Sequence, residues 1–281
     1  MTAAVGQWVA MMLPALHVAS EEGGNGFTPP TIGDFFPPAI LFEGTWFQID
    51  RIWIIRIVTT IVLVTVFVLA ARRAKLVPGR FQAAIEYLLE FVRRQIVYEI
   101  LGKVEGQRFV PMITTIFFSI LAFNITSIVP GLNLAGTSRV GLPLLLALWV
   151  MMAYWWAGIR KQGLGGYLKA SLFPPVCKQM PLLALIITPI EAVQIFVVRP
   201  ASLTIRLLAN MIAGHIMLVL CFTATEFFLL HASGAFKALS ALTLAGGIFV
   251  TLFELLVGFL QAYIFSLLAA AYIQMSLEEE H

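Results

Sequence analysis

Five long apolar stretches, separated by shorter polar segments, run through the sequence. The first covers residues 52–71 and has about the 20 residues that an α-helix needs to cross a bilayer. The next two, at 109–129 and 141–159, have similar lengths, whereas the last two, at 181–230 and 238–276, are much longer. The pattern predicts an all-α integral membrane protein with five transmembrane passages.

The segment 81–103 has a different pattern and is not counted as a passage. Its apolar side chains recur at helical spacing, with Glu and Arg side chains between them. This pattern is typical of an amphipathic helix that lies at the membrane interface or against a partner. The apolar positions are Phe81, Ala84, Ile85, Leu88, Leu89, Val92, Ile96 and Ile100.

The stretch 181–230 is too long for a single perpendicular helix. Its fifty residues would make roughly 75 Å of α-helix, whereas the hydrocarbon core is about 30 Å thick. It must tilt steeply, break or cross twice. A single steep passage, bent near Pro189 or Pro200, agrees better with the charge of the following loop, which carries only Lys237. The stretch 238–276 is over-long in the same way, with a possible bend at Gly246 and Gly247.

The distribution of charge predicts the orientation of the chain. Residues 1–50 contain no Lys or Arg, whereas basic residues follow the first passage at 72–75 and the third at 160–178. Because basic loops stay in the cytoplasm, the N-terminus is expected outside and the acidic end, Glu278–Glu280, inside. We therefore divide the chain into an extracytoplasmic N-terminal segment, 1–50, and a membrane domain, 51–281.

Composition supports this class of protein and excludes several others. The chain is 60% hydrophobic and 12% charged, against roughly 45–50% and about 25% in globular proteins. The sequence has no basic patch of the kind that binds nucleic acid. Cys177 and Cys221 are too far apart in the sequence to match the spacing of a metal-binding motif. No catalytic motif occurs. We expect no enzymatic activity in the chain itself, no metal site and no cofactor.

Arg206 lies in the middle of the stretch 181–230 and is the most informative residue. A guanidinium cannot release its proton, and its charge costs at least about 2.5–3.5 kcal/mol in hydrocarbon, which makes such residues candidates for function. The alternative is a structural salt bridge with Glu191, Glu226 or Glu254. At 100° per residue, Arg206 shares one face with Asn210 and with small side chains that allow another helix to approach closely: Ser202, Ala209 and Ala213.

The last stretch carries Glu254 and, seven residues later on the same face, Gln261. If the last two helices form an antiparallel hairpin, Glu254 meets His215, and an imidazole beside a carboxylate is suited to relaying protons. Simpler interpretations remain: His215 and Asn210 as packing residues, and Arg199 and Glu226 as side chains that snorkel to an interface. Asn124, Thr126 and Ser127 are interpreted as packing polar residues.

Three segments carry a resemblance to a known family. They are RPASLTIRLLANMIAGH (Arg199–His215), FELLVGFLQAYIFSLLAAAYI (Phe253–Ile273) and FFSILAFNITSIVPG (Phe117–Gly131). With them the chain resembles subunit a of the F-type ATP synthases, the stator channel of the Fo sector, from about residue 40 to its end. The pattern RPxSLxxRLxAN with a downstream LQAYIF is highly specific.

The resemblance assigns roles in proton translocation to individual residues. Arg206 matches the essential arginine of the family, Asn210 its polar neighbour and Gln261 the glutamine that faces it. His215 and Glu254 match an acidic or histidine pair. A further acidic residue usually lies fourteen positions before the arginine, whereas Glu191 lies fifteen before it. One residue rotates a helical side chain by about 100°.

The resemblance also implies a setting for the chain. It implies that the last two helices tilt steeply against a ring of c subunits, that two half-channels meet there, and that Arg206 separates them. Implied partners are the c-ring, the peripheral-stalk b subunits and other ATP synthase subunits, in a bacterial plasma membrane. Two other functions stay open: a secondary transporter or ion channel that acts alone, and a non-conducting assembly subunit.

Overall fold

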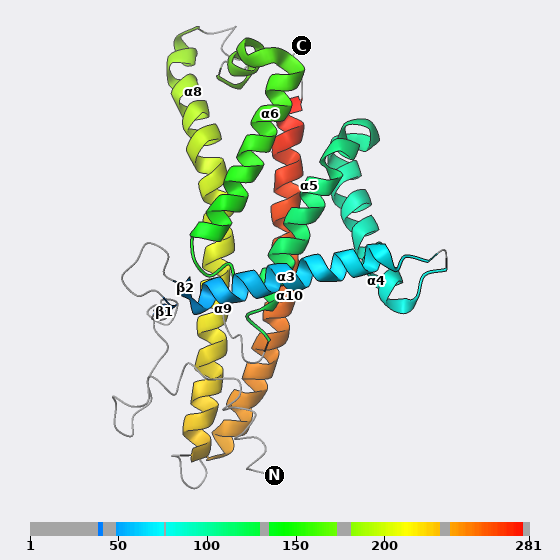
Figure 1. Ribbon diagram of the computed structural model, residues 1–281. Coiled ribbons are helices and arrows are strands. Elements are labelled where there is room, and N and C mark those ends of the chain that lie inside the picture. The colour runs from blue at the N-terminus through cyan, green and yellow to red at the C-terminus, as the bar shows by residue number, and fades with distance from the viewer. Residues whose placement is uncertain are drawn as a thin grey trace. The chain divides into compact units, whose positions relative to one another are not determined.

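The computed structural model describes residues 39–41, 49–75, 77–129, 135–172, 181–230 and 237–277. Within these residues the elements are helices (Figure 1), apart from a short antiparallel pairing of β1 (Ala39–Leu41) with β2 (Ile49–Asp50). Most of the predicted N-terminal segment 1–50, the loop 231–236 and the acidic end Glu278–Glu280 lie outside the described residues.

Among the described residues five helices are long and apolar enough to cross a membrane, which is the number that the sequence predicted. Length and apolar composition identify them. They extend over Arg51–Arg72, Arg80–Ile125, Gly141–Tyr167, Ile187–Leu230 and Leu239–Leu277.

The predicted amphipathic helix 81–103 is not one uniform α-helix. It consists of α4 (Arg80–Phe91), the π-helix η2 (Val92–Tyr98) and the first turn of α5 (Glu99–Ile125). Gly102 then has a positive φ of 72°, a backbone conformation that favours glycine and ends the regular helix. The apolar passage follows this kink and ends at Ile125, earlier than the expected residue 129.

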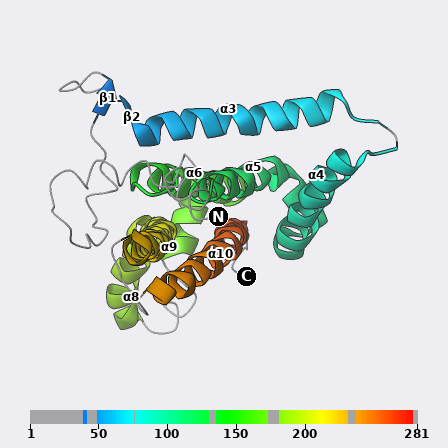
Figure 2. The same cartoon turned by 90° about the horizontal axis from the view of Figure 1, so that it is seen from below.

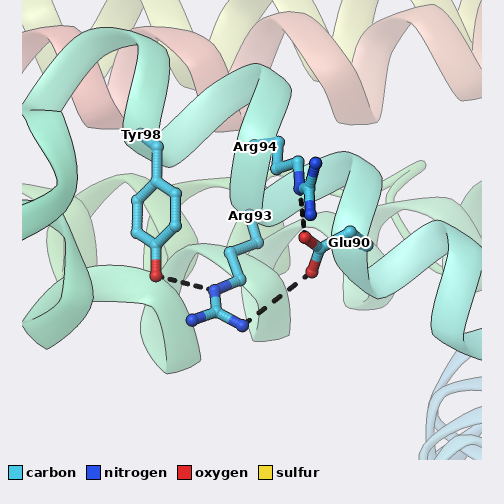
Figure 3. Close-up of polar contacts among 4 residues, drawn as sticks. All are labelled: Glu90, Arg93, Arg94 and Tyr98. Carbon is cyan, nitrogen blue, oxygen red and sulfur yellow. Dashed lines mark hydrogen bonds and ion pairs between the residues drawn. The ribbon is translucent and has the colours of Figure 1, made fainter.

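Charged side chains on the exposed side of this segment pair with one another (Figure 3). Glu90 accepts a hydrogen bond from Arg94 and lies 3.8 Å from Arg93, whose Nε donates to the Tyr98 hydroxyl at 2.7 Å. Exposed pairs of this kind each contribute at most about 1 kcal/mol to stability. They form a solvated face opposite the buried Val92 and Ile96.

The helix α6 (Gly141–Leu172) continues beyond the expected end of its passage at residue 159. Its regular part is interrupted at Gly163, which also has a positive φ, 74°. A Cβ at residue 163 would meet nothing within 4 Å, so the backbone conformation alone accounts for glycine at this position.

The over-long stretch 181–230 is one uninterrupted helical segment and does not cross twice. It is formed by α8 (Pro181–Val193), the π-helix η3 (Gln194–Val198) and α9 (Arg199–Leu230). The π-turn ends two residues before Pro200, one of the two prolines near which a bend was predicted. The final helix, α10 (Leu239–Leu277), continues through Gly246 and Gly247, and neither glycine has a positive φ.

The chain divides into two compact units, each built from three separate parts of the sequence. One unit comprises the residues up to Thr65, Ile120–Arg139 and Leu208–Leu260. In it, Ile52 and Ile55 of α3 (Arg51–Arg72) pack against Ile212 and Ile216 of α9, and Asp50 forms a salt bridge with Arg139.

The other unit comprises Val66–Ser119, Val140–Leu207 and the residues from Gln261 onward. Aromatic side chains are prominent in its packing. Phe67 lies edge-on to Phe118 with 4.9 Å between ring centroids, and Phe91 lies 5.9 Å from Tyr263. Such pairs add about 0.5–1.5 kcal/mol each beyond the burial of their area.

Candidate functional site

The helices α9 and α10 lie side by side in the unit that contains Glu254 (Figures 1 and 2). Three contacts set their register. A Cβ on Gly214 would lie 3.4 Å from the Glu254 carboxyl carbon, a Cβ on Gly247 would lie 3.3 Å from the Phe222 ring, and the hydroxyls of Thr225 and Thr243 are 2.9 Å apart. Residue numbers rise along one helix as they fall along the other, so the two helices are antiparallel.

Glu254 is buried against α9, with 4% of its surface exposed. Neither carboxyl oxygen has a hydrogen-bond partner among the described residues. The Ser127 hydroxyl is close to the carboxyl group, but it donates its hydrogen to the Asn124 carbonyl at 2.7 Å. An unpaired charged carboxylate is costly in such a place, so this carboxyl group requires a proton or a partner from outside the described chain.

His215 follows Gly214 directly and is also buried, with 8% of its surface exposed. Because Gly214 contacts Glu254, His215 and Glu254 lie at the same level of the helix pair. A direct contact between the imidazole and the carboxyl group stays a prediction.

Polar side chains at the end of α5 pack beside this part of α10. The Asn124 side-chain amide donates to the Gly258 carbonyl at 3.3 Å and accepts from the Thr137 hydroxyl at 2.9 Å. The Thr126 hydroxyl donates to the Phe123 carbonyl. These bonds agree with the interpretation of Asn124 and Thr126 as packing residues.

Ser127 was missed by the sequence analysis as a neighbour of Glu254. The two residues are far apart in the sequence: Ser127 lies in the turn after α5, and Glu254 lies on α10. The one signal for this contact in the sequence was the cluster of polar residues, Asn124, Thr126 and Ser127, at the end of the apolar stretch 109–129. Only the packing of α5 against α10 at Gly258, where a Cβ would lie 3.3 Å from Asn124 Cβ, brings them together.

Arg206 has an exposed side chain. It makes no salt bridge with Glu191, Glu226, Glu254 or any other residue in the part of the chain that the structure describes. The exposed strip of α9 around it holds small or flexible side chains: Ala209, Ala213, Met217 and Leu220. An adjacent side of the helix is buried at Leu203, Leu207 and Met211.

Two predicted site residues carry buried amide nitrogens without a hydrogen-bond partner among the described residues. They are Nδ2 of Asn210, which is half-buried, and Nε2 of Gln261, which is 6% exposed. Buried polar atoms in folded proteins are usually paired with protein or water. These two side chains therefore require partners such as water or a neighbouring subunit.

Glu191 is half-buried on α8, and the π-helix η3 lies between it and Arg206. In a π-turn each N–H bonds to the carbonyl five residues earlier, so the turn holds one residue more than an α-turn. Glu191 and Arg206 are fifteen residues apart, but because of this turn the angle between their side chains about the helix axis is close to that of residues fourteen apart in a regular α-helix. This accounts for the extra residue noted in the sequence.

Arg199 does not snorkel to an interface. It is 9% exposed, and its guanidinium carbon lies 5.9 Å from the ring centroid of Tyr154 and 5.2 Å from that of Tyr272. Contacts between a cation and aromatic faces are stronger when water is excluded. The sequence shows no sign of this arrangement, because the two tyrosines belong to other helices.

Comparisons with known proteins agree on one family. Residues 52–274 match the family model described as ATP synthase A chain. The chain is 45% identical over 272 residues to ATP synthase subunit a of Rhodococcus erythropolis, with 96% of each chain covered. It is 36% identical to that of Pseudarthrobacter chlorophenolicus, with 95% of this chain and 98% of the relative covered.

A third relative, ATP synthase subunit a of Streptomyces lividans, is 34% identical over 270 residues, covering 92% of this chain and 90% of the relative. The matches extend over nearly the whole chain and include all five long apolar helices. The protein is therefore a multi-pass membrane protein with bacterial relatives. The chain belongs to the ATP synthase subunit a family, whose members are non-catalytic, proton-conducting stator subunits of the Fo sector.

Proposed function

We propose that this chain forms two aqueous half-channels where it faces a ring of c subunits, and that Arg206 separates them. A proton enters one half-channel, binds a carboxylate of the ring, travels around with the ring and leaves through the other half-channel. The flow of protons thereby drives rotation and ATP synthesis. The observation that carries the proposal is the exposed Arg206 side chain without an ion-pair partner among the described residues.

In this proposal the fixed charge of Arg206 has two effects. A neighbouring positive charge favours the ionised form of a carboxylate, so a ring carboxylate gives up its proton before it passes the arginine. The same charge repels free protons between the half-channels. Each proton delivers about 2.3 kcal/mol per 100 mV of membrane potential, and a leak past Arg206 would waste that energy.

The remaining site residues line the route to the ring. Glu254 and His215 relay protons in one half-channel, which we assign to the outside, and this is supported by the buried, unpaired Glu254 carboxyl group. Asn210 and Gln261 orient Arg206, and each has an amide nitrogen still to be paired. Glu191 serves the second half-channel, and the π-turn of η3 supports its assignment by compensating for the extra residue.

The setting of the chain belongs to the same proposal. The last two helices tilt steeply against the c-ring, and the peripheral-stalk b subunits hold the chain against rotation. The N-terminus lies outside the plasma membrane and the C-terminus in the cytoplasm, as the absence of Lys and Arg from residues 1–50 suggests.

Cross-linking tests which face of α9 meets the ring. In a chain whose Cys177 and Cys221 are replaced by Ser, a cysteine at the exposed Ala213 carries a photoactivated cross-linker. We expect a covalent product with a c subunit in the intact complex. The control is a cysteine at Met211, which is 1% exposed and should give none. Equal cross-linking at the two positions would contradict the proposed interface.

A further inference from the structure

Pro200 leaves one backbone carbonyl of the membrane domain without a donor in its own helix. The Arg199 N–H donates to the Gln194 carbonyl, five residues earlier, as in a π-turn. It is therefore not given to Ile195, which it would reach in a regular α-helix. The next donor in the π pattern would be residue 200, but proline has no N–H.

Tyr154 of α6 supplies the missing donor. Its hydroxyl donates to the Ile195 carbonyl at 2.8 Å, and both residues are buried, with 1% and 5% of their surfaces exposed. A buried carbonyl without a hydrogen bond is destabilising. The Tyr154 hydroxyl therefore fixes the position of the π-turn relative to α6.

The ring of Tyr154 also contacts Arg199, the first residue after the π-turn. Arg199 is enclosed by the faces of Tyr154 and Tyr272, whose ring centroids are 6.2 Å apart. Among the described residues Arg199 has no carboxylate partner. All of these residues belong to the same compact unit, so α6 and α10 together determine how α9 is rotated at its start.

Arg206 follows Arg199 by seven residues, which is close to two full turns of α-helix. The two side chains therefore project from nearly the same side of α9. A rotation of the helix at the π-turn changes the direction of Arg206 by the same angle.

We propose that Tyr154 is a positioning residue for proton translocation: its hydroxyl bond to the Ile195 carbonyl, with its ring against Arg199, sets the direction of Arg206. The inference rests on the proposed function of Arg206. It assigns no contact between Tyr154 and a proton or the ring of c subunits.

The test is a double-mutant cycle in membranes that contain the complete ATP synthase. Tyr154→Phe removes only the hydroxyl. We expect ATP-driven proton pumping per assembled complex to fall by roughly tenfold, because a displacement of ~1 Å at a reacting group costs up to about a hundredfold in rate.

Pro200→Ala restores an N–H at residue 200, so Ile195 regains a donor from its own helix. The double variant Tyr154→Phe/Pro200→Ala should pump several times faster than Tyr154→Phe alone.

The matched control is Tyr167→Phe, on the same helix. Tyr167 is 7% exposed and its hydroxyl makes no hydrogen bond within the described residues, so pumping should be unchanged. If Tyr154→Phe prevents assembly, restored assembly and pumping in the double variant support the inference. It is overturned by normal pumping in Tyr154→Phe, or by a loss that Pro200→Ala does not relieve.

Arg206→Ala in the same membranes separates this inference from the proposed function. If Arg206→Ala stops pumping while Tyr154→Phe pumps normally, only the positioning role is wrong. If Arg206→Ala itself pumps normally, the proposed function of Arg206 is wrong.

Discussion

Gly214 on α9 allows the Glu254 carboxyl group of α10 to approach to the distance of direct contact. A Cβ on Gly214 would lie 3.4 Å from the Glu254 carboxyl carbon and 3.4 Å from Oε1. The two helices are thus in direct contact at the buried acid, next to His215. A small residue at position 214 therefore keeps room for this carboxyl group.

Enlarging residue 214 should displace Glu254. A methyl group at 3.4 Å is an ordinary contact, so Gly214→Ala should keep most of the proton-pumping rate. Gly214→Leu places extra carbon atoms where the carboxyl group lies, and we expect a loss of roughly tenfold, equivalent to about 1.4 kcal/mol. The measurement is ATP-driven acidification of inverted vesicles, normalised to assembled complex. Equal rates in the two variants would show that the contact is unimportant for flux.

Removing the acid at residue 254 should slow proton flux without preventing assembly. Glu254→Gln keeps the shape of the side chain but cannot exchange a proton as a carboxyl group does. Flux measured over a range of pH should be lower than in the wild type, while the amount of complex is preserved. Glu226→Gln, at a half-buried position on α9, is the control and should change little. An unchanged flux at every pH would reduce Glu254 to a packing residue.

A methyl group at Gly158 should destabilise the protein. A Cβ there would lie 2.3 Å from the Tyr167 ring and 3.2 Å from the Ser276 carbonyl. Overpacking of this kind costs about 1–3 kcal/mol, so Gly158→Ala should lower the temperature at which the complex dissociates in detergent. Gly165→Ala meets nothing within 4 Å and serves as the control, with unchanged or higher stability. Equal effects of the two substitutions would contradict the packing at Gly158.

The salt bridge between Asp50 and Arg139 should matter more than the one between Glu90 and Arg94. The side chains of Asp50 and Arg139 are 10% and 24% exposed, whereas those of Glu90 and Arg94 are 41% and 70% exposed. Loss of one partner from a fully buried pair costs about 3–5 kcal/mol and an exposed pair contributes at most about 1 kcal/mol, so the cost for this partly buried pair should lie between the two. Thermal dissociation should therefore occur at a clearly lower temperature in Asp50→Asn than in Glu90→Gln. The opposite order would mean that Asp50 is well solvated in the complex.

Much of the fold follows from local properties of the sequence. Apolar length and charge predicted five long helices. A bend in the stretch 181–230 near Pro189 or Pro200 stays a prediction, and the structure places a π-turn between these two prolines. The π-turns at 92–98 and 194–198 were not predicted, because they depend on which carbonyl each N–H reaches and not on apolar spacing. The helix α10 continues through Gly246 and Gly247, where packing against Phe222 favours glycine, and the bend expected there stays a prediction.

The candidate site was predictable where its residues share a helix. Arg206 and Asn210 are neighbours on α9, and the family resemblance identified Glu254 and Gln261 on α10. The position of Ser127 beside Glu254, and that of Tyr154 beside Arg199, depend on packing between segments that are distant in sequence. Arg199 was wrongly grouped with snorkelling side chains, because a cation held by aromatic faces has no signature in the spacing of charges.

The central claim is that the charge of Arg206 couples proton flow to rotation, and Arg206→Ala tests it most directly. The measurement is ATP synthesis driven by an imposed proton gradient and membrane potential in vesicles that contain the complete complex. The account predicts normal insertion and assembly but no synthesis, since protons would pass between the half-channels without turning the ring. Synthesis at the wild-type rate in vesicles that carry Arg206→Ala would contradict it.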